Sequence, residues 1–177
     1  GIGNDHDHVG RYFQEHVGFW HCARVVFNDQ QLTEQIEKPV WFSFAEEFLS
    51  KQQIMSGNIG LLPKKTPELS SFDKVYGRFN RWISNQEPRP MSAKYWAEKG
   101  IRPFDLTIDA EQAPNPSSRV TLDAESDIFG QQKLALNWDL SDFDRNNIRR
   151  NLELLGGELG RQDIGKLWIR PRLLTEW

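Results

Sequence analysis

Three short segments in the later part of the chain alternate polar and apolar residues, and this alternation constrains the fold more than any other feature of the sequence. The segments are residues 104–111, 119–122 and 133–138. A period of two is typical of a β-strand that is buried on one face. Just before the second segment, Pro114 and Pro116 bracket Asn115, which predicts a rigid turn with few backbone donors. The sequence therefore predicts three consecutive, neighbouring antiparallel strands, each with one face in solvent.

The parity of residues within these strands predicts which side chains share a face. The face expected to pack against helices holds Leu122, Leu134, Leu136 and Trp138. The opposite face holds Arg119, Thr121, Lys133 and Asn137. We expect Arg119 to form a cross-strand ion pair with Asp109 or Glu111, because both carboxylates lie in the preceding predicted strand.

Further strands and helices are predicted along the rest of the chain. Strands are expected at residues 19–27, 40–42, 57–62 and 166–169, and helices at residues 43–53, 70–82 and 141–155. The first strand is apolar on both faces, which indicates that both are covered. A capping-box pattern opens the first helix at Ser43, and Gly156-Gly157 is expected to end the third. Groups of strands separated by helices favour an α+β fold, with a mainly antiparallel sheet and helices on one face.

The composition excludes several classes of protein. The 177 residues suit one domain. The net charge of −3 comes without a basic stripe, so we expect no nucleic-acid partner. No apolar run approaches the ~18–20 residues of a membrane span. The only cysteine, Cys22, is expected to be a small core residue, and the lack of an internal disulfide favours a reducing compartment such as the cytoplasm, with a periplasmic location left open.

The sequence offers few residues for catalysis or metal binding. His6 and His8 flank Asp7 and can in principle chelate a transition metal. No third well-spaced His or Cys supports them, so we expect a solvated loop and no metal site. The chain also lacks the Gly-x-Ser-x-Gly elbow of many serine hydrolases. No pair of Asp or Glu residues stands out as a glycosidase-type pair.

Two segments resemble the glucose-methanol-choline (GMC) family of FAD-dependent oxidoreductases. Residues 114–122 read Pro-Asn-Pro-Ser-Ser-Arg-Val-Thr-Leu and lead to Leu-Ala-Leu-Asn-Trp at 134–138. Residues 9–16 read Val-Gly-Arg-Tyr-Phe-Gln-Glu-His, followed by Val17 where the family usually has Pro. The resemblance runs from residue 4 to residue 177 in order and spacing, although residues 30–100 match by position only.

The resemblance implies one domain, residues 1–177, that corresponds to the family's substrate-binding domain with its roughly six-stranded sheet. The FAD-binding domain is absent, because no strand leads into a Gly-x-Gly-x-x-Gly turn. The family's catalytic His lies beyond the region that residues 173–177 resemble, so no catalytic residue is expected in this chain. We expect the chain alone to be inactive and to bind no FAD.

In the intact protein, the resemblance implies a flavin that takes a hydride from the CH–OH carbon of a sugar, polyol or other alcohol. The partners are then the FAD-binding domain of the same protein and this small-molecule donor. Val9, Gly10, Arg11 and His16 are expected beside the cofactor and the domain interface. Arg119 and Thr121 are expected on the side of the substrate pocket. As a structural alternative, Gly10 only permits a turn and Arg11 pairs with a carboxylate such as Glu15.

Two other functions stay open at this point. A non-catalytic carbohydrate-binding module can use exposed tryptophans such as Trp41, Trp82 or Trp96, since sugars stack on aromatic rings. A metal-binding protein would use His6 and His8. The residues flanking this chain in its coding sequence would discriminate between them, because a Gly-x-Gly-x-x-Gly turn upstream identifies the oxidoreductase.

Overall fold

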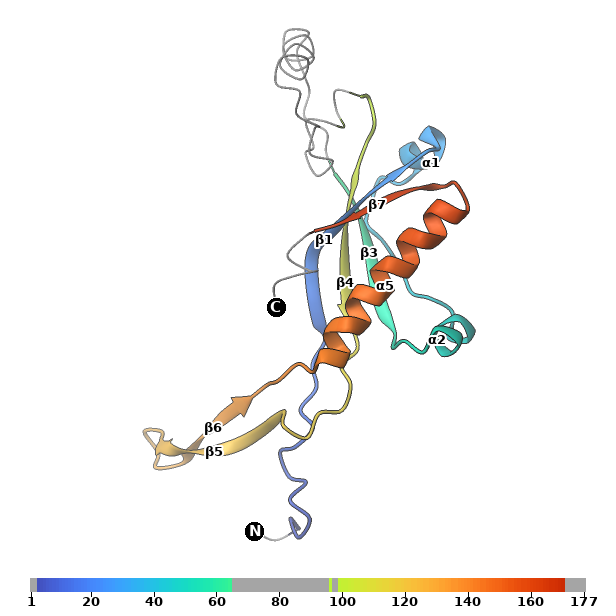
Figure 1. Ribbon diagram of the computed structural model, residues 1–177. Helices are drawn as coiled ribbons and strands as arrows, with labels where there is room; N and C mark the ends of the chain where they lie inside the picture. The colour runs from blue at the N-terminus through green and yellow to red at the C-terminus, as the bar shows by residue number, and fades with distance from the viewer. Residues whose placement is uncertain (1–2, 65–95, 97–98, 171–177) are drawn as a thin grey trace, which may run out of the picture.

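The computed structural model describes residues 3–64, Trp96 and residues 99–170. Its main element is a five-stranded antiparallel sheet, called here the main sheet, with the order β2-β3-β4-β1-β7 (Figure 1). The strands are β1 (Val17–Phe27), β2 (Val40–Phe42), β3 (Gly57–Pro63), β4 (Phe104–Ala110) and β7 (Gly165–Ile169). The strands predicted at residues 19–27, 40–42, 57–62 and 166–169 are therefore confirmed.

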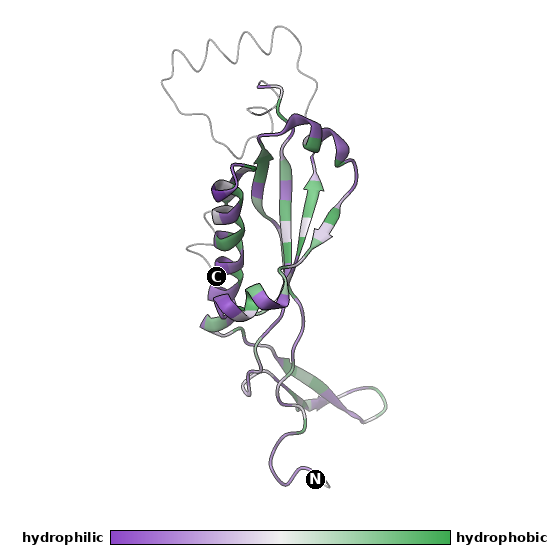
Figure 2. Cartoon of the chain, turned by 90° about the vertical axis from the view of Figure 1, so that its right-hand side faces the viewer, coloured by the Kyte–Doolittle hydropathy of each residue, from purple (hydrophilic) through white to green (hydrophobic). Residues whose placement is uncertain are grey.

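One face of the main sheet packs against a long helix, α5 (Asp142–Arg161) (Figure 2). From β4, Leu106 and Ile108 point toward Ile148 and Leu152 of α5, and all four are at most 1% exposed. Most of the hydrophobic core lies in this layer, because burying aliphatic side chains is the main favourable term in folding. The predicted α+β class, with an antiparallel sheet and helices on one face, is confirmed.

The helix α5 begins as predicted but ends later than predicted. The Ser141 side chain accepts from the backbone of Asp144, and the Asp144 carboxylate accepts from the backbone of Ser141, which forms a capping box. Gly156 and Gly157 do not end the helix, which continues to Arg161. A glycine inside a helix costs about 1 kcal/mol relative to alanine. The leucines around the two glycines pack on the core and offset that cost.

Two short helices flank the main sheet. In α1 (Gln30–Gln35), the N-cap side chain of Asp29 accepts hydrogen bonds from the backbone amides of Gln31 and Leu32. The helix predicted at residues 43–53 is confirmed as α2 (Glu46–Gln52). Its N-cap is Ala45 with no side-chain cap, so the capping box predicted from Ser43 is wrong. The helix predicted at residues 70–82 lies outside the described residues.

The prediction of three neighbouring strands is wrong in its pairing. The first, β4, lies in the main sheet between β3 and β1, whereas β5 (Arg119–Ser126) and β6 (Gln132–Asn137) form a separate antiparallel pair, called here the hairpin (Figure 1). Residues 111–118 carry the chain from one to the other. Nor does β4 have a face in solvent, since Asp105 and Thr107 are as buried as their apolar neighbours.

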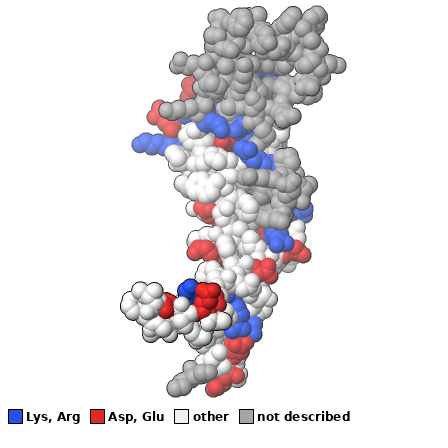
Figure 3. Space-filling model, turned by 90° about the vertical axis from the view of Figure 1, so that its left-hand side faces the viewer, with Lys and Arg blue, Asp and Glu red and all other residues white. Residues whose placement is uncertain are grey.

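The hairpin projects from the body of the molecule as an arm (Figure 1), and the space-filling view shows mostly uncharged atoms at its end (Figure 3). Ile128 and Phe129 at that end are 93% and 81% exposed. The predicted parity is confirmed, because Leu122 pairs with Leu134 and Arg119 pairs with Asn137. The predicted burial is wrong: the residues expected to face helices are exposed, namely Leu122, Leu134, Leu136 and Trp138.

Candidate functional site

The N-terminal segment and the hairpin are joined by one carboxylate. Asp7 receives hydrogen bonds from the Arg11 guanidinium, with Nε at 3.0 Å from Oδ2, and from both terminal nitrogens of Arg119 at 3.2 Å. We call these three residues the Asp7 clamp. The hydrogen bonds from Arg119 and Arg11 hold the pKa of the Asp7 carboxyl well below its usual range. Arg119 therefore pairs with Asp7, and the predicted pairing with Asp109 or Glu111 is wrong.

The clamp also joins the two segments that carry the family resemblance. Arg11 donates from Nη1 to the carbonyl oxygen of Pro116 at 3.1 Å, so it touches the Pro-Asn-Pro turn directly. Residues 11 and 119 form a β-bridge. Arg11 pairs with Asp7, and the alternative pairing with Glu15 is not present. Residues more than 100 positions apart in the sequence thus form one local structure.

Gly10 is required by the close approach of these two segments. Its φ angle is +79°, and the Val120 amide donates to its carbonyl oxygen at 2.7 Å. A Cβ atom at this position would lie 2.1 Å from the Val120 carbonyl oxygen. Glycine is therefore needed here for the contact as well as for the turn.

The structure does not bring all the predicted site residues together. Arg11 and Arg119 share the Asp7 clamp, and Val9 lies beside it with 62% exposure. Thr121 is exposed on the hairpin and pairs with Ala135. His16 lies elsewhere, in a shallow hollow of about 400 Å³ near the start of β1 that Met55 and Glu111 also line. The six predicted residues thus occupy three places.

A network of polar side chains fixes the hairpin to the body. Gln112, which is 4% exposed, accepts from the indole of Trp138 at 2.8 Å and donates to the carbonyl oxygen of Asp139 at 3.0 Å. Ser118 and Asn115 donate to the same carbonyl oxygen at 2.8 and 3.1 Å. Trp138 is thus held by a hydrogen bond at the base of the hairpin, and its predicted place in the core is wrong.

The face of the main sheet opposite α5, called here the second face, carries polar residues and tryptophans of the strands, whereas the strand phenylalanines pack with the core. A bulge in β1 lies at its centre, because three residues of β1, Trp20 to Cys22, stand opposite the single residue Thr107 of β4. His21 there has a φ angle of +54°. Bulges re-aim side chains and are frequent next to functional sites. Cys22 is fully buried, as predicted, and its thiol contacts the carbonyl oxygen of Leu106.

Asp105 gathers three cationic or titratable side chains around one buried carboxylate. Arg24 donates from Nε to Oδ1 at 2.9 Å, Lys64 lies 2.8 Å from Oδ2, and His21 Nδ1 lies 3.1 Å from Oδ2. The Arg24 side chain is 2% exposed and that of Asp105 is 4% exposed. Burial opposes the charged form of Asp105, but the hydrogen bonds and charges of Lys64 and Arg24 prevail and lower its pKa.

Two tryptophans lie exposed on the second face, each beside a glycine. A Cβ atom on Gly60 would lie 2.9 Å from the ring of Trp41, which shows that this ring packs closely over the backbone of β3. A Cβ atom on Gly18 would lie 2.8 Å from the Asp109 carboxylate and 4.0 Å from the indole nitrogen of Trp20. Trp41 and Trp20 are 41% and 59% exposed. The second face therefore offers flat rings next to polar groups, an arrangement that suits a polyhydroxylated ligand.

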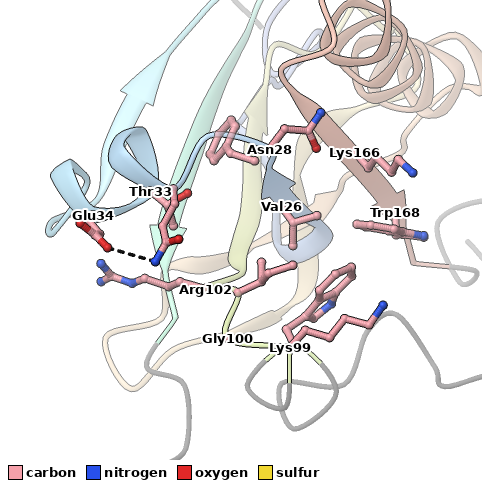
Figure 4. A pocket seen from close by; sticks show the side chains of 13 residues that line it. Val26, Asn28, Thr33, Glu34, Lys99, Gly100, Arg102, Lys166 and Trp168 are labelled. Carbon is pink, nitrogen blue, oxygen red and sulfur yellow. Dashed lines mark hydrogen bonds between the residues drawn. The ribbon is translucent and has the colours of Figure 1, made fainter.

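A pocket of about 560 Å³ lies at one end of this face, between α1, β7 and residues 99–102 (Figure 4). Trp96 and Trp168 form one wall, with ring centroids 5.2 Å apart. Trp96 is only 6% exposed, so the prediction of an exposed ring there is wrong. Lys99, Arg102 and Lys166 line the pocket together with the Glu34 carboxylate. We call this cavity the Trp168 pocket.

His6 and His8 lie in the N-terminal loop with their ring centroids 6.2 Å apart. Among the residues that the structure describes, no group of three or more His, Cys, Asp or Glu side chains is placed to hold a metal ion. The expectation that these histidines bind no metal stays a prediction.

Comparison with protein-family models gives no match for this chain, and comparison with curated proteins gives none either. Every helix in the described part of the chain is too short or too polar to span a membrane.

Sequence reasoning missed the Asp105 cluster and the Trp168 pocket. The available signal was a charged residue inside an otherwise buried strand pattern, as at Arg24 and Asp105, because such residues are almost never fully buried unless they are paired. The pairing itself is not visible in the sequence, since it depends on β1 and β4 being neighbours across 81 positions.

Proposed function

We propose that this chain is the substrate-binding domain of an FAD-dependent oxidoreductase of the GMC type, acting on the CH–OH group of a sugar, polyol or other alcohol. The observation that carries the proposal is the Asp7 clamp. It joins the two segments that resemble the family, and Gly10 and Arg11 of one segment contact Val120 and Pro116 of the other. A resemblance located in two distant parts of a sequence gains support when the two parts form one structural unit.

The layout of the molecule supports a domain that covers a partner. The hairpin leans toward the side of the main sheet that faces away from α5 (Figure 2). The second face and the hairpin therefore lie on the same side of the molecule. Leu134 is 72% exposed and Phe129 is 81% exposed, which is unusual unless such residues meet a partner. We propose the FAD-binding domain of the same protein as that partner.

The residues of this chain suit a position beside a flavin. They do not form the kind of site that binds the phosphates of FAD. In the Asp7 clamp, both arginines already form ion pairs with the Asp7 carboxylate. In addition, no strand in the described residues leads into a glycine-rich turn at a helix N-terminus, the structure that binds a dinucleotide pyrophosphate. When bound, FAD supplies the acceptor for the hydride of the donor. The second face would orient the donor through the exposed rings of Trp20 and Trp41 and exclude water from the reacting carbon.

The test has two parts, and each can contradict the proposal. The isolated chain, titrated with FAD and followed by flavin fluorescence, is expected to show no binding of micromolar or better affinity. The protein expressed with its flanking coding sequence is expected to carry flavin absorbance and to reduce a dye with an alcohol or sugar as donor. Tight FAD binding by the isolated chain, or a longer protein that carries no flavin, contradicts the proposal.

A variant of the flavin-bearing protein then tests the second face. Trp41→Ala is expected to raise the KM for the donor several-fold and to leave the flavin spectrum unchanged, because the ring would contact the donor and not the cofactor. Lys51→Ala, on the exposed surface of α2, is the matched control and should change neither. An unchanged KM in Trp41→Ala would contradict the assignment of the second face.

A second candidate is a non-catalytic carbohydrate-binding module, which the exposed rings of Trp20 and Trp41 on one face favour. It predicts that the isolated chain binds an oligosaccharide by itself and that Trp41→Ala removes this binding. The flavin absorbance of the longer protein discriminates the two candidates, because a binding module needs no flavin.

A further inference from the structure

We propose that the Trp168 pocket binds a small organic anion that carries an aromatic ring. This inference does not depend on the proposed function. The donor of the proposed reaction is a neutral sugar or alcohol, whereas the charges in this pocket favour an anion. The pocket also lies at the end of the second face, beside α1, and away from the rings of Trp20 and Trp41.

The charge of the pocket argues for an anion. Among its described lining residues, Lys99, Arg102 and Lys166 carry positive charge and only Glu34 carries negative charge. Glu34 already accepts a hydrogen bond from the Gln30 side chain at 3.3 Å. Within the described residues, neither Arg102 nor Lys166 forms an ion pair with a carboxylate. Arg102 and Lys166 are therefore cationic groups of the cavity that form no ion pair with a described carboxylate.

The arrangement of these groups suits one ligand in contact with several of them. In Figure 4, Lys166 and Lys99 flank Trp168, and Arg102 lies across the pocket beside Glu34. The guanidinium of Arg102 lies 5.8 Å from the ring centroid of Phe104. An anionic group in the cavity would be attracted by Arg102 and Lys166.

The tryptophan wall argues for a ring. Trp96 is buried and its ring lies 5.2 Å from that of Trp168, so it holds Trp168 in place. Trp168 is only half-buried and presents part of its surface to the cavity. Aromatic rings prefer offset or edge-to-face contact with one another at such distances. Val26 and Ile101 extend the apolar part of the lining.

Charge alone would give weak and unspecific binding. Lys99 and Lys166 are exposed, and solvent and salt screen the attraction of exposed lysines for an anion. The ring contact and the charge must act together to give a specific site. A volume of about 560 Å³ falls within the range of small-molecule sites. The pocket therefore discriminates a ring-bearing anion from both a bare anion and a neutral ring.

The experiment compares four probes with the chain by calorimetric titration in low salt. Phenyl phosphate and benzoate carry both features, inorganic phosphate carries only the charge, and benzyl alcohol carries only the ring. At least one of the two ring-bearing anions is expected to bind about tenfold more tightly than either partial probe, a difference of about 1.4 kcal/mol. The tighter of the two identifies the preferred anionic group. If neither exceeds the partial probes, the proposal is overturned.

Variants locate the site. Lys166→Gln and Arg102→Gln are each expected to weaken the tighter probe about fivefold or more, because each removes one cation from the lining. Lys133→Gln, an exposed lysine of the hairpin, is the matched control and should leave the affinity unchanged. Indole nitrogen NMR adds a readout that needs no mutation: two of the seven tryptophan signals, those of Trp96 and Trp168, should shift. An equal loss in Lys133→Gln, or shifts among the other five signals alone, overturns the proposal.

Discussion

The main sheet and the hairpin both contain segments with polar–apolar alternation, yet these segments differ in burial. In β4, Leu106 and Ile108 are fully buried, and the polar residues that alternate with them, Asp105 and Thr107, are buried too. In β5 and β6, Leu122 and Leu134 form a cross-strand pair and are 63% and 72% exposed. The same pattern thus gives a core strand in one region and a protruding arm in the other.

This difference shows what alternation reports. A period of two tells which side chains share a face, and the parity is correct in both regions. It does not tell what covers each face. In the main sheet, α5 covers one face, and ion pairs satisfy Asp105 on the other. In the hairpin, nothing in the described part of this chain covers the leucines, which is why we assign them to a partner surface.

The largest expected effect comes from breaking the charge cluster of the main sheet. Asp105→Asn is expected to lower the free energy of unfolding by about 3–5 kcal/mol, because it leaves the buried Arg24 guanidinium without its carboxylate. Glu125→Gln removes half of an exposed ion pair in the hairpin, and its cost should not exceed about 1 kcal/mol. Urea unfolding of both variants measures the two values. A similar small cost in both would mean that Arg24 reaches water on the second face.

A pair of identical substitutions tests the contrast between the two regions directly. Leu106→Ala is expected to cost about 2–5 kcal/mol, because it deletes buried methyl groups and leaves a cavity. Leu136→Ala, which is 52% exposed, should cost within about 0.5 kcal/mol, as a surface change usually does. Equal costs in urea unfolding would show that the hairpin leucines are covered in the isolated chain.

The pH dependence of stability sharpens the same contrast. The pKa of Asp105 is lowered in the folded state, so the unfolded chain takes up a proton at a higher pH than the folded chain does. The stabilisation by Asp105 is therefore complete above its unfolded pKa, about 3.9, and is lost as the pH falls toward the lower folded value. Urea unfolding between pH 6 and pH 3 should show a steeper loss for the wild type than for Asp105→Asn. Parallel curves would contradict this role of Asp105.

The smallest and most local effect is expected at the contact between the N-terminal segment and the hairpin. Gly10→Ala places a Cβ atom against the Val120 carbonyl oxygen and should separate the two segments without unfolding the main sheet. Hydrogen exchange of the Val120 amide, which donates to Gly10, should become faster while that of β4 stays unchanged. Gly130→Ala is the control, because Gly130 has a similar φ of +76° but open space around it. Equal effects of both would assign the result to backbone strain alone.

The candidate sites were only partly predictable. The alternation and the Pro-Asn-Pro turn indicated Arg119 as a polar-face residue, and the N-terminal motif indicated Gly10 and Arg11. That Asp7 binds both arginines was not visible, because the contact between residues 7 and 119 spans 112 positions. The Trp168 pocket combines residues from α1, β7 and the segment before β4. No local pattern connects these three segments.

What the sequence by itself determined is local: the β1, β3, β4 and β7 segments, the parity of β5 and β6, and the start of α5 near Ser141. These depend on residues within a few positions of one another, whose backbone and side-chain preferences act over short range. Only the tertiary structure decided that β4 pairs with β1 and β3 and not with β5. It also decided that Arg24 is neutralised and that the leucines of the hairpin stay exposed. Strand pairing and burial depend on which distant segments can be covered together, and a pattern of period two is the same whether its apolar face meets a helix, another domain or water.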